Sequence, residues 1–222
     1  MRICGKVLLL FLVFTPVPLV AATILHEDFG SDIDPCQIPA DWVVQDLLEL
    51  EHEGGGTCGW KWRVNEEVEV NNTRDSNTSD SDGGCFVLAH SDECGVGTSV
   101  DTVLSMPPID CSDLTGTALS FKYDAFDKFE TSLFTVEVST NEGNDWTVMW
   151  QKNQSDRGPK TATLDLGTVA DGQVSLLIRF RYTASYDWWW QVDDVTVSAD
   201  EKNTFNWLLF MPAITTGTRS IP

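Results

Sequence analysis

Residues 186–197, YDWWWQVDDVTV, place three consecutive tryptophans directly before a pair of aspartates. Side chains alternate between the two faces of a β-strand, so Trp188 and Trp190 share one face. Trp189 takes the opposite face, on the side of Asp193. The three rings therefore cannot form one flat binding platform. We expect one or two of them to fill a core, where each buries on the order of 200 Å².

Apolar residues at every second position recur in short segments along the chain, and turn residues separate these segments. In residues 132–140, SLFTVEVST, the side chains of Phe134, Val136 and Val138 face one side, and the NEGNDW that follows is typical of a hairpin turn. About ten such strands indicate an all-β domain. Because a single sheet would leave one apolar face in water, we predict a two-sheet antiparallel β-sandwich of the jelly-roll type. Residues 42–50, WVVQDLLEL, are expected as a strand but also fit a helix.

The chain divides into three predicted parts. Residues 1–22 have the pattern of a secretory signal peptide, because Arg2 and Lys6 begin an apolar stretch that ends in the small residues of VAA. Residues 23–199 form the predicted sandwich domain. Residues 200–222 form a tail whose apolar FNWLLFMPAI either docks on the domain or serves as a sorting or attachment segment. Both apolar stretches are too short to span a bilayer, so we expect a secreted or cell-surface protein without a transmembrane span.

The composition is strongly acidic, with 34 Asp and Glu against 14 Lys and Arg and a formal net charge of -20. Such a chain repels phosphate backbones, which argues against nucleic acid as a partner. The balance suits a soluble extracellular protein or one that meets cations, and solubility alone would also explain it.

Five cysteines remain once Cys4 of the predicted signal peptide is removed from the six in the chain. In an oxidising compartment they favour disulfides over metal thiolates. The short spacing makes Cys85–Cys94 the first expected pair and Cys36–Cys58 the second, although connectivity does not follow from sequence. Cys111 is then the cysteine left over.

Catalytic motifs are absent from the sequence. The three histidines, His26, His52 and His90, lie in no nucleophile elbow and in no zinc-binding pair. Carboxylates are plentiful, so a glycosidase-like pair stays open as an alternative. We therefore expect a protein that is not an enzyme.

Binding of a hard cation is better supported, because acids stand at several strand margins. Calcium takes six to eight oxygen ligands and can collect them from loops far apart in sequence. The candidate oxygens belong to Glu27, Asp28, Asp92, Asp101, Asp193 and Asp194. Any single one of them is also an ordinary solvated acid at a strand end.

The collinear order of EDF at 27–29, CGW at 58–60, SDECGVGTSVD at 91–101 and the strand pair at 174–197 resembles a family of extracellular domains. These are the MAM-like and cleaved-adhesin jelly rolls of the choice-of-anchor type, which are galactose-binding-like in fold. The resemblance covers roughly residues 24–197. It implies a non-catalytic role in adhesion or in glycan or protein binding, with structural calcium.

Carried over by position, the resemblance also implies a set of calcium ligands. Glu27 matches the acid that opens the first strand motif, Asp92 the second acid of an Asp-Ser-Asp turn, and Asp193 the first acid of the terminal pair. Asp101 matches an acid before the next strand. His90 departs from the family pattern, which often has aspartate there, and this difference would cost the site one ligand.

Tyr186 and Trp189 are the candidates for ligand contact, as rings left exposed for stacking on a sugar or a partner protein. The sequence thus predicts a secreted, calcium-stabilised, non-catalytic module that binds extracellular glycans or proteins. Two alternatives stay open. One is a glycan-active hydrolase with a carboxylate pair, and the other is a structural matrix component without a discrete ligand.

Overall fold

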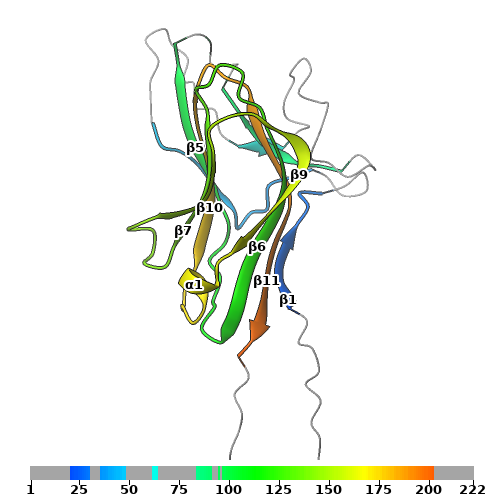
Figure 1. Ribbon diagram of the computed structural model, residues 1–222, viewed down its shortest axis with the longest axis vertical. Coiled ribbons are helices and arrows are strands. Elements are labelled where there is room, and N and C mark those ends of the chain that lie inside the picture. The colour runs from blue at the N-terminus through cyan, green and yellow to red at the C-terminus, as the bar shows by residue number, and fades with distance from the viewer. Residues whose placement is uncertain are drawn as a thin grey trace, which may run out of the picture.

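The computed structural model describes residues 21–30, 36–48, 62–64, 84–91, 95 and 97–202. Most of the predicted signal peptide and residues 203–222 of the predicted tail lie outside that set, so the expected chain boundaries stay predictions. The described part consists of strands and one short helix, α1 (Gly167–Ala170). Figure 1 shows the strands arranged as two facing sheets. This confirms the predicted all-β sandwich.

The first sheet has the order β3-β4-β11-β6-β9, with β1 also paired to β11. Its strands are β1 (Ala22–Glu27), β3 (Arg63–Val64), β4 (Val87–His90), β6 (Leu114–Ala125), β9 (Asp156–Asp165) and β11 (Trp189–Glu201). The second sheet has the order β2-β5-β10-β7-β8. Its strands are β2 (Val43–Asp46), β5 (Ser99–Ser105), β7 (Leu133–Ser139), β8 (Thr147–Lys152) and β10 (Leu177–Ser185). Every strand pairing is antiparallel, and β2 decides the ambiguity over residues 42–50 in favour of a strand.

The core lies between the two sheets and is built largely from aromatic rings. Trp190 of β11 is fully buried there. Its ring centroid lies 5.3 Å from that of Trp62, 5.7 Å from that of Trp150, and 5.8 Å from those of Phe134 and Phe180. Such edge-to-face and stacked contacts add to the free energy of burial. The prediction that at least one tryptophan of the triplet fills the core is confirmed.

A β-bulge interrupts β11 at the aspartate pair. Asp193 pairs with Lys122 of β6 and Thr196 pairs with Ser120, so β11 has one more residue than β6 over this stretch. Asp194 has a φ of 47°, in the left-handed region that aspartate adopts more readily than most residues. On the other edge of β11, β4 pairs with residues before the bulge and β1 with residues after it. The bulge therefore marks the point where β11 changes its neighbour.

A disulfide joins Cys36 to Cys85, so both predicted cysteine pairs are wrong for these two residues. The reason is topological, because the end of β1 and the start of β4 meet beside β11. Backbone hydrogen bonds from Gln37 to Phe29 and from Cys85 to Gly30 bring the two segments together, with the cysteine Cα atoms 5.5 Å apart. Proximity in sequence was a poor guide to proximity in the sheet.

Cys111, the cysteine predicted to be left over, is a buried free thiol. Cys58 and Cys94 lie outside the described residues. No helix in the described part of the chain is long and apolar enough to cross a membrane.

Candidate functional site

The candidate site lies at the end of the sandwich where β6 passes into β7 and β10 passes into β11. The two connections are residues 126–132 and 186–188. Pairing of Trp190 with Ala125 and of Thr183 with Leu133 holds their bases side by side. In Figure 1 this end is at the top, opposite α1. Each connection passes from one sheet to the other, and the strands at their bases are paired, β6 with β11 and β7 with β10.

Asp187 fastens one connection to the other. Its carboxylate is fully buried and accepts hydrogen bonds from the backbone N–H groups of Lys128 and Trp188, both at 2.7 Å. It also accepts from the backbone N–H of Phe129 and from the N–H and hydroxyl of Thr131, the last at 3.0 Å. A buried carboxylate is stable only when donors surround it in this way. The loop 126–132 therefore has one preferred position.

A second buried carboxyl, that of Asp127, lies against Asp187. Its Oδ1 accepts hydrogen bonds from the backbone N–H groups of Thr131 and Ser132. Burial raises the pKa of Asp127 to about 6, and hydrogen bonding to Asp187 contributes to the rise. Burial also acts to raise the pKa of Asp187, but hydrogen bonds from Asp127 and from the backbone outweigh it and lower that pKa. The Asp127 carboxyl therefore keeps its proton to a higher pH than the Asp187 carboxyl does.

Above this pair, aromatic rings and cationic groups form a continuous row. The rings of Tyr186 and Phe129 stack at 5.8 Å with 12° between their planes. The Lys128 ammonium lies 5.4 Å from the centroid of Phe129 and 4.9 Å from that of Trp188. These distances are those of cation–π contacts, so the lysine bridges two rings.

The row continues from Trp188 to the outer face of the first sheet. The centroid of Phe126 is 4.7 Å from that of Trp188, and the Arg157 guanidinium lies 4.3 Å from the Phe126 centroid. Arg157 Nε donates to Asp124 at 2.7 Å. We call this row the aromatic strip, and its members are Tyr186, Phe129, Lys128, Trp188, Phe126 and Arg157.

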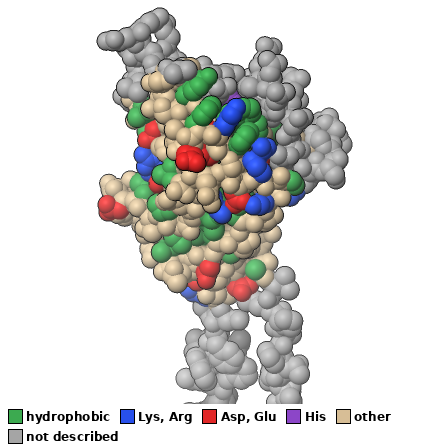
Figure 2. All heavy atoms as spheres, turned by 45° about the horizontal axis from the view of Figure 1, so that its top comes forward, with side chains coloured by type: hydrophobic (Ala, Val, Ile, Leu, Met, Phe, Trp, Pro, Cys, Tyr) green, Lys and Arg blue, Asp and Glu red, His purple; other side chains and the backbone are tan. Residues whose placement is uncertain are grey.

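The aromatic strip is open to solvent along much of its length. Phe129 is 48% exposed, Lys128 is exposed, and Tyr186 and Trp188 are partly exposed. Figure 2 brings this end of the sandwich forward, and hydrophobic and basic side chains lie side by side on its described surface. Exposed rings on a fixed base are the usual means by which a protein contacts a sugar or a partner protein.

The two predicted ligand-contact residues lie in different environments. Tyr186 is part of the aromatic strip. Trp189 is only 3% exposed, so the expectation of an exposed stacking face there is wrong. Its Nε1 donates to the buried Asp124 at 2.9 Å, and Phe126 and Arg157 pack against its ring. The outer face of the first sheet is therefore covered here rather than open.

Sequence reasoning found Tyr186 but missed the other five members of the strip. Trp188 lies just before β11, where strand alternation no longer applies, and it is the partly exposed tryptophan of the triplet. Lys128 and Phe129 lie in DKFE between two strands, and an aromatic residue beside charges in a connection was the signal that could have revealed them.

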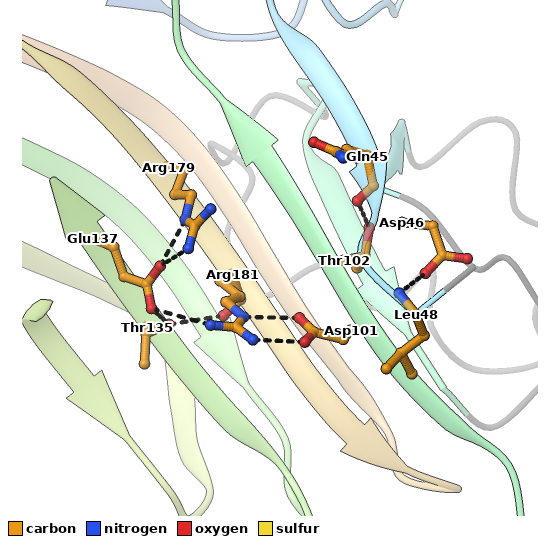
Figure 3. Close-up of polar contacts among 9 residues, drawn as sticks. All are labelled: Gln45, Asp46, Leu48, Asp101, Thr102, Thr135, Glu137, Arg179 and Arg181. Atoms are coloured by element: carbon orange, nitrogen blue, oxygen red, sulfur yellow. Dashed lines mark hydrogen bonds and ion pairs between the residues drawn. The ribbon is translucent and has the colours of Figure 1, made fainter. Parts of the chain in front are cut away.

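The three predicted calcium ligands that the structure describes come from both sheets. Glu27 ends β1 and Asp193 lies in the bulge of β11, whereas Asp101 belongs to β5 in the opposite sheet. Both oxygens of Asp101 accept from Arg181, at 2.8 and 2.6 Å (Figure 3). Both carboxylate oxygens of Asp101 therefore already have a cationic partner, and its role as a calcium ligand stays a prediction. Asp92 lies outside the described residues.

Glu27 ends β1 and has a partly buried carboxyl. Its Oε1 accepts the backbone N–H of Phe29 at 2.7 Å. Burial raises the pKa of the Glu27 carboxyl, and the nearby carboxylates of Asp28 and Asp41 add to the rise. Within the described residues, however, no three His, Cys, Asp or Glu side chains are grouped so as to hold a metal ion.

The Asp101–Arg181 pair belongs to a charged network on the outer face of the second sheet (Figure 3). Arg181 also approaches Glu137 at 3.7 Å, and Glu137 accepts from Arg179 at 2.6 Å. The Arg179 guanidinium lies 3.8 Å from the ring centroid of Trp146. Because each charge here has a partner on a neighbouring strand, the network ties β5, β10 and β7 together.

Comparison with known proteins gives the fold. No protein-family model and no curated protein matches the sequence. The K1 cleaved adhesin domain of Lys-gingipain from Porphyromonas gingivalis W83 is similar in structure, with a TM-score of 0.51 and 20% identity over 81% of this chain and 99% of that one. The K3 cleaved adhesin domain of the same protein has a TM-score of 0.51 and 18% identity over 80% of this chain and 99% of that one. The chain has the fold of a cleaved adhesin domain. This confirms the resemblance found in the sequence at the level of the fold.

Proposed function

We propose that this protein is a secreted, non-catalytic binding module that recognises an extracellular glycan through the aromatic strip. The observation that carries the proposal is the row of partly exposed rings at one end of the sandwich, with Phe129 48% exposed. Sugar rings offer flat C–H faces that pack on aromatic rings, and a few aromatic anchors supply most of the free energy of binding. The Cys36–Cys85 disulfide supports secretion, because disulfides persist in oxidising compartments.

The fixed position of the strip supports binding over a purely structural role. Hydrogen bonds from Lys128, Thr131 and Trp188 to Asp187 hold the loop before any ligand arrives. A surface that is already ordered loses less conformational entropy when it binds. A purely structural role in a matrix does not explain why exposed rings are held on an ordered loop.

The glycan-active hydrolase is the weaker alternative. A hydrolytic pair must reach the glycosidic bond, with its carboxyls about 5 Å or more apart. Asp127 is 7% exposed and Asp187 is fully buried, so neither carboxyl is open to a glycosidic bond. The geometry of this pair favours a role in holding the loops.

A glycan array probed with the mature chain tests the proposal. We expect binding that falls about tenfold or more in Phe129→Ala and Trp188→Ala, because each variant removes an aromatic anchor. Val148→Ala is a matched control, since Val148 is also 48% exposed but lies on β8 away from the strip. Glycan binding that both ring variants leave intact would contradict the proposal, and binding to a protein ligand alone would replace the glycan with that partner.

We also propose that calcium stabilises the domain near the end of β1, with Glu27 as one ligand. The support is a partly buried carboxyl whose pKa is raised by burial and by Asp28 and Asp41. A bound cation relieves both effects, because it offsets the lost hydration and the repulsion between carboxylates. Asp92 and Asp193 stay candidates for the same site.

Melting curves in chelator and in millimolar calcium test the cation proposal. We expect a higher Tm in calcium, because an ion that binds only the folded chain stabilises it. Glu27→Gln should abolish the difference. Asp101→Asn should lower Tm by breaking the pair with Arg181 but keep the calcium-induced shift. Identical wild-type curves in the two conditions would end the proposal.

A further inference from the structure

We infer that the ligand of the aromatic strip is an acidic glycan, a saccharide whose sugar rings carry carboxylates, as uronic acids do. The inference rests on the proposed function, because it names the ligand class of the same surface. It comes from the two cationic groups of the strip, Lys128 and Arg157, and from the state of the carboxylates around them.

Lys128 differs from the other lysines that the structure describes. Three of them pair with aspartates: Lys122 with Asp194, and Lys152 and Lys160 with Asp156. Lys202 donates to the carbonyl of Ser112. The Lys128 ammonium has no carboxylate partner among the described residues and lies instead over two rings. In a chain with 34 acids and 14 basic residues, an exposed lysine without an acidic partner is available to an anion from outside.

Arg157 supplies a second positive charge at the other end of the row. Its Nε donates to Asp124, which fixes the guanidinium over Phe126, and 40% of its side chain stays exposed. A guanidinium presents a planar set of donors that matches a carboxylate. The strip therefore places a cation beside exposed rings at two points along its length.

The two cations of the strip differ in their carboxylate partners. Asp124 is buried and accepts from Arg157, the backbone of Gly158 and the indole of Trp189. In the buried pair beneath the loop, Asp187 and the Oδ1 of Asp127 accept from backbone N–H groups. Glu130 is the exposed acid in the two connections. Arg157 is thus paired with Asp124, whereas Lys128 has no carboxylate partner among the described residues, and Glu130 is the exposed acid beside it.

The net charge of -20 does not override this local arrangement. At physiological ionic strength, exposed charges farther apart than about 8 Å are largely screened. A bound sugar therefore senses mainly the groups it touches. Its C–H face can pack on Phe129 and Tyr186 while its carboxylate accepts from Lys128, and this combination favours an acidic sugar over a neutral one.

Isothermal titration of the mature chain with a matched ligand pair tests the inference. The probes are a tetramer of galacturonic acid and the same tetramer with its carboxyls methyl-esterified. We expect the free acid to bind about tenfold more tightly, the gain from one charge-assisted hydrogen bond. Lys128→Gln should remove this preference, and the ratio of the affinities for acid and ester is the readout, because Lys128 also contacts two rings of the strip. Glu130→Gln should increase the affinity for the acid.

Lys202→Gln is the control, because it removes a lysine at the opposite end of the sandwich and should leave both affinities unchanged. Equal binding of acid and ester, or a preference that survives Lys128→Gln, would overturn the inference while the proposed function stands. Equally tight binding of polyglutamate would overturn the assignment to a sugar. If neither tetramer binds but a neutral glycan does and requires Phe129, only the acidic class fails. If no glycan binds at all, the proposed function fails with it.

Discussion

Asp127 and Asp187 make the stability of the domain depend on pH. The pKa of Asp127 is raised to about 6 by burial and by Asp187, so the folded chain holds this proton more tightly than the unfolded chain does. Its contribution to stability is therefore complete below the ordinary aspartate pKa and is lost as pH rises through about 6. Asp187, whose pKa is lowered, has the opposite sign, and its contribution is lost only in stronger acid.

We predict that the free energy of unfolding rises by about 1 kcal/mol between pH 7 and pH 5 because of Asp127. Asp127→Asn imitates the protonated carboxyl, so the variant should be more stable than the wild type at pH 7 and should lack this part of the pH dependence. Urea unfolding at several pH values measures both. The difference between the two proteins is the informative quantity, because Glu27 and the overall negative charge change with pH in both. Parallel pH profiles would contradict the raised pKa of Asp127.

Within β11, the bulge explains why residues on both sides of it face the core. Before the bulge the inward residues are Trp190 and Val192, and after it they are Val195 and Val197, all fully buried. A regular strand would turn the second group outward, because side chains alternate. The additional residue at Asp194 restores the inward direction.

The conformation of Asp194 can be tested with a matched pair of variants. Asp194→Asn and Asp194→Val both lose the ion pair with Lys122, which is partly exposed on both sides. Asparagine tolerates a positive φ, whereas a β-branched side chain does not. We predict that the valine variant is less stable than the asparagine variant by about 1–2 kcal/mol, measured by urea unfolding. Equal stability of the two would mean that Asp194 does not hold the φ of 47° in solution.

For β11, the sequence predicted the faces of two tryptophans but not the side chains that cover one of them. Alternation correctly assigned Trp190 to the core and placed Trp189 on the other face, because both depend only on neighbours in one strand. It could not show that Arg157 and Phe126 cover Trp189, since that contact joins different strands. The position of Trp188 beside Phe126 likewise depends on the pairing of β11 with β6.

The sequence did not reveal the partner of Asp101 for a related reason. Acids at strand ends look equivalent in sequence, but the Arg181 that engages Asp101 is eighty residues away and becomes its neighbour only through the pairing of β10 with β5. The fold could be predicted from the sequence more readily than the site. Alternating apolar residues recur in every strand, whereas each contact of the site is made by one particular pair of residues.

Across the whole molecule, the Cys36–Cys85 disulfide closes the first sheet where β11 changes from β4 to β1. The bond spans 49 residues of sequence. A crosslink over a loop of that length restricts the unfolded chain, and the loss of chain entropy corresponds to about 4 kcal/mol of stability. It also fixes the segment after Glu27, so the proposed cation site depends on it.

We predict that the double variant Cys36→Ala/Cys85→Ala loses about 4 kcal/mol in urea unfolding. Cys111→Ala is the control, because it removes a buried free thiol and should cost only about 1 kcal/mol, the effect of a small core change.

Digestion of the oxidised wild type without reduction, followed by mass spectrometry, should recover Cys36 and Cys85 in one linked pair of peptides. Recovery of Cys85 linked to Cys94 instead would contradict the connectivity. The calcium-induced rise in Tm should then be smaller in the double variant, because the residues after β1 would no longer be tied to the strand that follows Cys85.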